Sequence, residues 1–452
     1  MTAATLQTPG QLQLRLGIAF ALAVSVGNII GSGIMRTPGL VADQVPSVWM
    51  LIALWLFGGL HTLLLANVAS ELITSFPKAG GSFVPVRAAF GETMGLLAGW
   101  TEWLARTGAI AALSAACANF VAMIVPAADV WAVPIAAAFA LSLVALNWPG
   151  VREGQVAQIT GSLLKVGLIV GVIIVAFVAE PTSVGEVVER AGSAADSATP
   201  AVGFLALVGA YQLIYGAYSG WQAPCYFVEE DANAVRNIPR ALAGSILLVT
   251  AIYVALNVSL LAALDMDALR ASDLPVALVI ENAFGKSGGV LVALLAIVIV
   301  VVAINALVMS TSRILYGMAR DGLFLSAALR VNRGGTPDVA LGVTTIVALL
   351  LIFSGGFVFL FKLMAALASL VFLIYSVSLF ALRHKFPDLP RPFRAIGYPL
   401  LPALACLLNS GLLIAFIAAE PVSGLYMLAL IGVCVPVGII SHRRRQRLAA
   451  TP

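Results

Sequence analysis

The chain has 452 residues, of which 61% are hydrophobic and only 10% are Asp, Glu, Lys or Arg. Soluble proteins carry about 25% charged residues, so this composition provides too little polar surface to keep a folded chain of this length in water. A soluble enzyme is therefore excluded. The net charge of +4 is small and spread over short basic groups, so no nucleic-acid partner is expected.

The cysteine and histidine content argues against a disulfide framework and against a metal centre. All four cysteines lie inside apolar stretches, which is not the pattern of a disulfide scaffold or a paired-Cys metal site. Three histidines are too few to favour a His-built centre. We expect no metal ion and no cofactor. The first apolar run lacks a following cleavage site of small residues, so we expect a retained span rather than a signal peptide.

Apolar runs long enough to cross a membrane recur along the whole chain. A spanning helix needs about 20 residues, and charged, Pro or Gly clusters separate twelve such runs. They cover about residues 14–36, 46–74, 86–124, 129–148, 155–179, 201–228, 238–264, 288–316, 338–354, 357–382, 398–419 and 422–441. The hydropathy pattern predicts an all-α membrane protein with twelve transmembrane helices.

Charged residues divide unevenly between alternate loops. The loops after the fifth and seventh runs are acidic, whereas the opposite loops and the C-terminal tail are basic. The basic set includes Lys78, Arg87, Arg152, Arg236, Arg240, Arg320, Arg330, Arg333, Arg383, Lys385, Arg391, Arg394, Arg443, Arg444, Arg445 and Arg447. Because cytoplasmic loops are enriched in Lys and Arg, we predict a multi-pass protein of the inner, cytoplasmic membrane with both termini in the cytoplasm.

Glycine clusters interrupt the first and sixth runs at matching depths. Paired broken spans are typical of secondary transporters built from inverted repeats, and they mark the substrate site. The predicted organisation is a cytoplasmic tail over residues 1–13, a first repeat of five helices over 14–180, a second repeat over 201–383, two further helices over 397–441 and a basic cytoplasmic tail over 442–452. Helices 1 and 6 are expected to be unwound at mid-membrane.

The first break is a candidate anion site. It comprises Ile30, Gly31, Ser32, Gly33 and Ile34. Glycine gives the backbone the freedom to open a helix, and the freed amides at the start of the outer half-helix, together with the helix dipole, suit a carboxylate. The alternative interpretation is a close-packing face of small residues spaced four apart.

The sixth-run break offers the complementary chemistry. It comprises Tyr215, Gly216, Ala217, Tyr218 and Ser219. Carbonyl groups at the C-terminal end of a half-helix favour an ammonium group, so the two breaks together predict a pocket for a zwitterion. Tyr215, Tyr218 and Trp221 are candidate aromatic gates, although simple bundle packing is an alternative for Trp221.

Charged residues within the apolar runs are few. Lys165 lies in the fifth run, where burial of its charge costs at least about 2.5 to 3.5 kcal/mol. It is expected to act as a fixed charge in place of a coupling cation or as a proton-titrating switch; the alternative is snorkelling to the inner interface. Glu102 and Arg106 lie four residues apart in the third run, and we interpret them as a structural ion pair.

Five segments distributed along the chain resemble a known family. They are GNIIGSGIMRTPG from Gly27, ASELITSFPKAGGSF from Ala69, YSGWQAPCYFVEEDANAVRNIPRAL from Tyr218, STSRILYGMARDGLFLSAALRVNRGGTPDVAL from Ser310 and LRHKFPDLPRPFRAIGYPLLP from Leu382. On these segments the chain resembles the amino acid, polyamine and organocation (APC) transporter superfamily and its L-type amino acid transporter branch. Its short outer link after the third run, which has no cysteine, resembles that of the branch's bacterial members.

The resemblance implies a LeuT-like fold of two inverted five-helix repeats plus two C-terminal helices. It also implies that the first-helix amides hold the substrate carboxylate, that the sixth-helix carbonyls hold the amine, and that Lys165 links the two helices in place of a sodium ion. The chain departs from the family pattern at Gly216, where an aromatic gate is common. It also lacks the cysteine that animal members carry in the link corresponding to Val125–Asp129, so no disulfide-linked accessory subunit is expected.

These observations predict a secondary transporter of α-amino acids, most simply neutral ones, that works by alternating access. The resemblance implies that transport is sodium-independent. Its expected partners are the amino-acid substrate and the lipid bilayer, and its oligomeric state is open. Exchange and proton symport both remain possible. Cationic amino acids or polyamines are the second substrate class, although no acidic residue lies in the sixth-helix break. A receptor that binds an amino acid without carrying it is the alternative of another class, and no motif of an enzyme is present.

Overall fold

The computed structural model describes residues 17–31, 33–78, 80–179, 185, 203–272, 274–285, 287–354, 357–419, 421–434 and 436, and the fold in these residues is helical. The α-helices are α1 (Ile18–Ile29), α2 (Gly33–Gln44), α3 (Val48–Ser75), α4 (Phe83–Phe90), α5 (Glu92–Ile124), α6 (Ala132–Asn147), α7 (Val151–Ala179), α9 (Phe204–Tyr218), α10 (Ala234–Ala263), α11 (Met266–Ala271), α12 (Pro275–Phe284), α13 (Ser287–Arg320), α14 (Asp338–Ser354), α15 (Phe357–Lys385), α16 (Leu400–Ala419) and α17 (Pro421–Gly432). Three short 3-10 helices join them: η1 (Pro126–Trp131), η2 (Ala223–Glu230) and η3 (Ser326–Leu329).

Several helices have the length and composition of membrane spans. Within the described residues, eight helices are long and apolar enough to cross a bilayer, and the bent pair α1 and α2 would make nine. A helix satisfies its backbone hydrogen bonds internally, which is why such runs adopt this form in lipid. Of the other expected spans, α9 has 15 residues, α14 has 17 and α17 has 12, so the count of twelve remains a prediction.

Large apolar side chains cover the outside of the bundle. Leu163 and Val178 of α7 are 70% and 74% exposed, and Leu407 of α16 is 70% exposed. Apolar surface of this extent is unfavourable in water but matches contact with lipid. The expected terminal tails, residues 1–13 and 442–452, lie outside the described residues.

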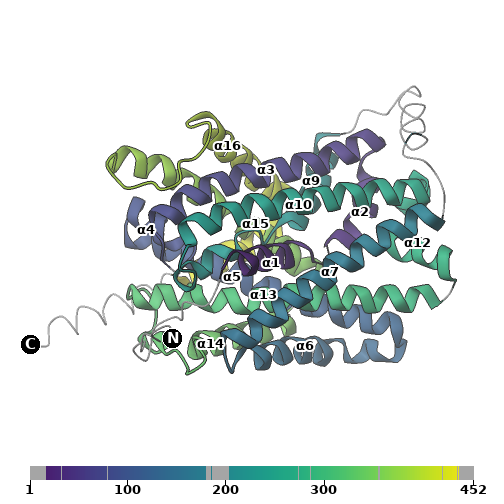
Figure 1. Ribbon diagram of the computed structural model, residues 1–452, viewed down its shortest axis with the longest axis horizontal. Helices are drawn as coiled ribbons and strands as arrows, with labels where there is room; N and C mark the ends of the chain where they lie inside the picture. Colours follow the sequence, from purple (N-terminus) through teal and green to yellow (C-terminus); the bar gives the residue numbers. More distant parts are fainter. Residues whose placement is uncertain are drawn as a thin grey trace, which may run out of the picture.

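The core of the bundle is organised around α5 and α1. The long helix α5 packs against α13, α14 and α15, and α3 runs beside α10 (Figure 1). The short helix α1 lies near the middle of the bundle, where it packs against α7, α10 and α13 (Figure 1). Helix α1 therefore ends deep inside the protein rather than at a surface.

Two helices end abruptly in this central region. Helix α1 ends at Ile29, Ile30 has extended backbone angles, and α2 begins at Gly33 with a 43° change of direction. Helix α9 ends at Tyr218 and is followed by a turn in which Gly220 has φ of +104°. A Cβ atom at Gly220 would lie 2.8 Å from the Asn28 carbonyl oxygen. Only glycine fits this conformation and this close approach of the two chain segments.

Candidate functional site

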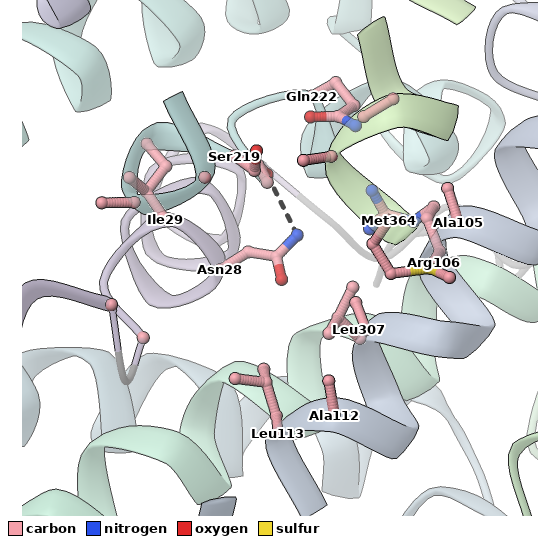
Figure 2. A pocket seen from close by; sticks show the side chains of 18 residues that line it. Asn28, Ile29, Ala105, Arg106, Ala112, Leu113, Ser219, Gln222, Leu307 and Met364 are labelled. Carbon is pink, nitrogen blue, oxygen red and sulfur yellow. Dashed lines mark hydrogen bonds between the residues drawn. The ribbon is translucent and has the colours of Figure 1, made fainter. Parts of the chain in front are cut away.

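A cavity of about 120 Å³ lies where the two interrupted helices meet. A buried water molecule needs about 10–15 Å³ of such space, so the cavity can hold a ligand the size of a small amino acid. One side is formed by the ends of α1 and α9 and the residues that follow them, namely Asn28, Ile29, Gly31 and Gly33 with Gly216, Ala217, Ser219, Gly220 and Gln222. The facing side is formed by α5, α13 and α15, namely Ala105, Arg106, Ala109, Ala112, Leu113, Leu307, Met364, Ala365 and Ala368. Figure 2 shows Asn28 and Ser219 across the opening from Ala112 and Leu113.

The structure brings some of the predicted site residues together at this cavity. Gly31, Gly33, Gly216, Ala217 and Ser219 line it. The side chains of Ile30 and Ile34 are fully buried in the hydrophobic core and are not among the lining residues. Ser32 lies outside the described residues. Parts of both predicted breaks therefore line one space, although Gly216 and Ala217 lie within helix α9, which continues to Tyr218. The unwinding of the sixth helix at Tyr215–Tyr218 stays a prediction.

The three candidate gates pack elsewhere in this conformation. Tyr215 donates its hydroxyl to Asn409 Oδ1 at 3.3 Å on α16, and Tyr218 donates to the Trp55 carbonyl at 2.9 Å on α3. Trp221 stacks on Phe372 of α15 with ring centroids 5.3 Å apart. None of the three is among the residues that line the cavity. Their gating role remains a prediction, and the observed contacts are those of packing side chains.

Lys165 is fully buried beside the first break. Its ammonium donates to the Gly27 carbonyl at 2.7 Å and to the Ile30 carbonyl. Both acceptors belong to the C-terminal end of α1, where the helix dipole favours a positive charge. The side chain points into the bundle rather than toward a membrane interface, and among the described residues these two hydrogen bonds join α7 to α1 and not to α9.

Tyr253 is a functional candidate that the sequence analysis missed. Its hydroxyl, carried by α10, lies 3.1 Å from the Ile29 carbonyl and 3.0 Å from the Ala217 carbonyl. One side chain thus bonds the last turns of both interrupted helices. Tyr253 lies in the middle of the seventh apolar run, and a buried tyrosine hydroxyl needs a hydrogen-bond partner. This feature of the sequence could have identified Tyr253 as a candidate.

Two further side chains tie the breaks to each other. The Asn28 amide donates to the Gly220 carbonyl at 3.0 Å, which is the dashed line in Figure 2. The Ser25 hydroxyl donates to the Trp221 carbonyl at 3.1 Å. These bonds use carbonyls of the turn that follows α9. The relative position of the two breaks is therefore set by side chains of α1 and α10.

The chemistry available at the cavity follows from the helix ends around it. Helix α2 begins at Gly33, and the first amides of a helix have no partner within that helix. These amides and the helix dipole favour an anionic group. Helix α9 ends at Tyr218, and its last carbonyls favour a cationic group. Across the described residues, no group of three or more His, Cys, Asp or Glu side chains is arranged to hold a metal ion.

The interpretation of Glu102 and Arg106 as an ion pair is wrong. Glu102 accepts from the Ser82 backbone amide at 2.9 Å, from the Ser82 hydroxyl at 2.7 Å and from the Tyr226 hydroxyl. Arg106 instead donates from Nη2 to Ser310 Oγ at 2.5 Å and lies 4.3 Å above the Tyr226 ring. Residues spaced four apart can pair on a helix, but here neighbouring elements supply the partners.

We expect Tyr253→Phe to weaken substrate binding about tenfold. The change removes only the hydroxyl, and leaving a buried carbonyl unpaired costs about 1–3 kcal/mol, where 1.4 kcal/mol is a factor of ten. Equilibrium binding of a labelled amino acid to the purified protein measures the effect. Tyr426→Phe, at an exposed tyrosine of α17, is the control, and equal affinity in the two variants would remove Tyr253 from the site.

Comparison with known proteins gives the family. The family model for amino acid permeases matches residues 16–436. The chain belongs to the amino acid permease family. This confirms the superfamily resemblance, and with the apolar helices it indicates a multi-pass membrane transporter rather than an enzyme.

Individual relatives match most of the chain. It is 30% identical over 451 residues to "Large neutral amino acids transporter small subunit 2" of Oryctolagus cuniculus, covering 94% of this chain and 80% of that protein. It is 29% identical to "Asc-type amino acid transporter 1" of Mus musculus, covering 91% and 78%. It is 28% identical to "b(0,+)-type amino acid transporter 1" of Mus musculus, covering 91% and 84%. These relatives are mammalian, so the resemblance to bacterial members in particular stays a prediction.

Proposed function

We propose that this permease is a sodium-independent secondary transporter of neutral α-amino acids that works by alternating access. The observation that carries the proposal is the convergence of two interrupted helices on one cavity, with the start of α2 and the end of α9 at its wall. An amino-acid zwitterion carries one group for each helix end. The names of the relatives, which are amino acid transporters, support the same class.

Within this proposal, the amides from Ile30 to Ile34 hold the substrate carboxylate, and the carbonyls from Tyr215 to Ser219 hold the ammonium group. Lys165 takes the place of a coupling cation, because its ammonium already occupies carbonyls at the end of α1. These carbonyl oxygens are therefore not free to coordinate a sodium ion. We further propose the LeuT-like plan of two inverted repeats over 14–180 and 201–383 followed by two helices, twelve in all, in the cytoplasmic membrane with both termini inside.

A neutral substrate is favoured by the charges at the cavity. No Asp or Glu is among the residues that line it, and one arginine, Arg106, is. A cationic side chain would meet this guanidinium without an acidic partner. The second candidate class, cationic amino acids or polyamines, is therefore disfavoured.

We also propose that transport requires no disulfide-linked subunit. The name of the Oryctolagus cuniculus relative includes "small subunit", which concerns that protein. In this chain Cys117, Cys225 and Cys434 are buried and Cys406 is half-buried, and the Val125–Asp129 link contains no cysteine. Transport by the purified single chain would support this point.

Uptake into proteoliposomes tests the function. A panel of labelled amino acids is offered to vesicles that are empty or preloaded with unlabelled amino acid, at equal inner and outer pH. Uptake that depends on preloading indicates exchange, and equal uptake in empty vesicles indicates uniport or symport, which a pH gradient then separates. Binding without uptake in every condition would favour the receptor alternative and contradict transport.

Gly216→Phe is expected to shift substrate preference toward small amino acids. Gly216 lines the cavity, and a benzyl group there would occupy much of its volume of about 120 Å³. We expect the preference for leucine over alanine to fall about tenfold, since several buried methylene contacts of about 0.8 kcal/mol each are lost. Competition by both amino acids against labelled substrate measures the ratio, and an unchanged ratio would place Gly216 outside the selective part of the pocket.

A further inference from the structure

Part of the cavity carries polar side chains that the binding of an α-amino acid backbone does not use. We propose that Arg106 and Gln222 form a subsite for the substrate's side chain and that this subsite selects a carboxamide, as in glutamine or asparagine. The inference rests on the proposed amino-acid transport and specifies which neutral substrates are preferred. Both residues line the cavity, and Figure 2 shows them on the side away from Ile29.

Arg106 has unused hydrogen-bonding capacity although it is only 4% exposed. A guanidinium has five N–H donors. Nη2 donates to Ser310 Oγ at 2.5 Å and Nη1 donates to the Tyr226 hydroxyl at the long distance of 3.4 Å, while Nε is buried without a partner in the part of the chain that the structure describes. The Tyr226 hydroxyl accepts from Arg106 and donates to the Glu102 carboxylate, so it links the two charged groups.

The incomplete hydrogen bonding of Arg106 is energetically unfavourable. A buried donor without a partner costs about 1–3 kcal/mol, and more when the group is charged. The charge of Arg106 is joined to the Glu102 carboxylate through the Tyr226 hydroxyl, which is weaker than a direct ion pair. A ligand oxygen that accepts from Nε would remove the penalty of the unpaired donor. Ser310 and Tyr226 hold the guanidinium in place, which would let it act as a positioned donor.

Gln222 supplies the complementary group. It follows Gly220 and Trp221 in the turn between α9 and η2, so its position depends on the same break that is proposed to bind the ammonium group. Its side-chain oxygen Oε1 is buried and has no hydrogen-bond partner among the described residues. Arg106 and Gln222, which both line the cavity, therefore each have one polar atom without a partner among the described residues.

A carboxamide matches this pair in both directions. Its carbonyl oxygen accepts from Arg106, and its amino group donates to Gln222 Oε1. A carboxylate lacks the donor for Oε1, an aliphatic side chain leaves both groups unpaired, and an ammonium group is repelled by the guanidinium. A site built to hydrogen-bond a ligand discriminates strongly against analogues that cannot make those bonds.

Competition against labelled alanine tests the subsite, with glutamine, asparagine, leucine, glutamate and lysine as competitors. Alanine serves as the reference because its methyl group is too short to use the subsite. We expect glutamine to compete about tenfold better than leucine. One or two hydrogen bonds to a charged or buried partner provide the free energy for a difference of this size. In Gln222→Met, which keeps the length and removes the amide, that preference should fall about tenfold, with the affinity of each competitor measured relative to alanine in the same variant.

Arg106→Lys provides the second variant, because it keeps the charge but loses Nε. It should also reduce the glutamine-to-leucine ratio, and size-exclusion chromatography of the purified variant reports whether the protein is folded. A wild-type protein that does not prefer glutamine over leucine, or an unchanged ratio in Gln222→Met, would overturn the subsite. Stronger competition by glutamate than by glutamine would overturn the carboxamide assignment. Failure of every amino acid, alanine included, to bind would instead contradict the proposed function itself.

Discussion

Lys165→Ala is expected to reduce amino-acid uptake about a hundredfold. The Lys165 ammonium donates to the carbonyls of Gly27 and Ile30, at the point where α1 stops. Without it two buried carbonyls lose their partner, and each loss costs about 1–3 kcal/mol, or about tenfold. We expect the end of α1 to rearrange so that the amides of the first break no longer converge on the cavity.

Uptake into proteoliposomes and thermal unfolding in detergent together measure this effect. Leu164→Ala is the matched control, because Leu164 precedes Lys165 on α7 and is 50% exposed, so it faces lipid. The variant should also remain independent of sodium, since an alanine does not rebuild a cation site. Uptake equal to that of the wild type would reduce Lys165 to a packing residue and would contradict its proposed role in place of a cation.

Gly31→Leu is expected to abolish substrate binding while the protein still folds. Gly31 lines the cavity, and a Cβ atom there would meet only the Ala303 Cβ and the Ile29 carbonyl, each at 4.0 Å. Gly31 is not one of the glycines with positive φ, so a leucine backbone is permitted. The rest of the leucine side chain would then extend into the space that the ligand needs.

Equilibrium binding to the purified variant measures the loss, which we expect to exceed about a hundredfold because steric overlap with the ligand cannot be relieved cheaply in a packed interior. Gly167→Leu is the control, because Gly167 of α7 is exposed and a Cβ there would meet nothing within 4 Å. Size-exclusion chromatography of both variants reports folding. If Gly31→Leu binds substrate normally, the first break is not part of the site.

The proposed carboxamide subsite and the two glycine breaks divide recognition between them. The breaks act through backbone groups, which every α-amino acid can use. Arg106 and Gln222 act through side chains and would distinguish one amino acid from another. Loss of a backbone contact at the breaks should therefore affect all substrates alike, whereas a bulky side chain at Gly216, or changes at Arg106 or Gln222, should alter their order.

The sequence by itself determined the features that depend on local composition. Long apolar runs predict membrane helices because the backbone must bond to itself in lipid, and glycine clusters predict their interruptions. The position of Lys165 in an apolar run predicts a buried partner. In the structure, residues of both breaks line one cavity, and the Lys165 ammonium donates to the carbonyls of Gly27 and Ile30 at the end of α1.

Only the tertiary structure decided which side chains share a space. Tyr215 and Tyr218 belong to the predicted second break and Trp221 follows it, yet these side chains pack against α16, α3 and α15. Arg106 bonds Ser310, 204 residues away, rather than Glu102 one turn before it. Such contacts depend on how each helix is rotated and which neighbours it meets, and a periodic pattern along one helix contains no information on the neighbours.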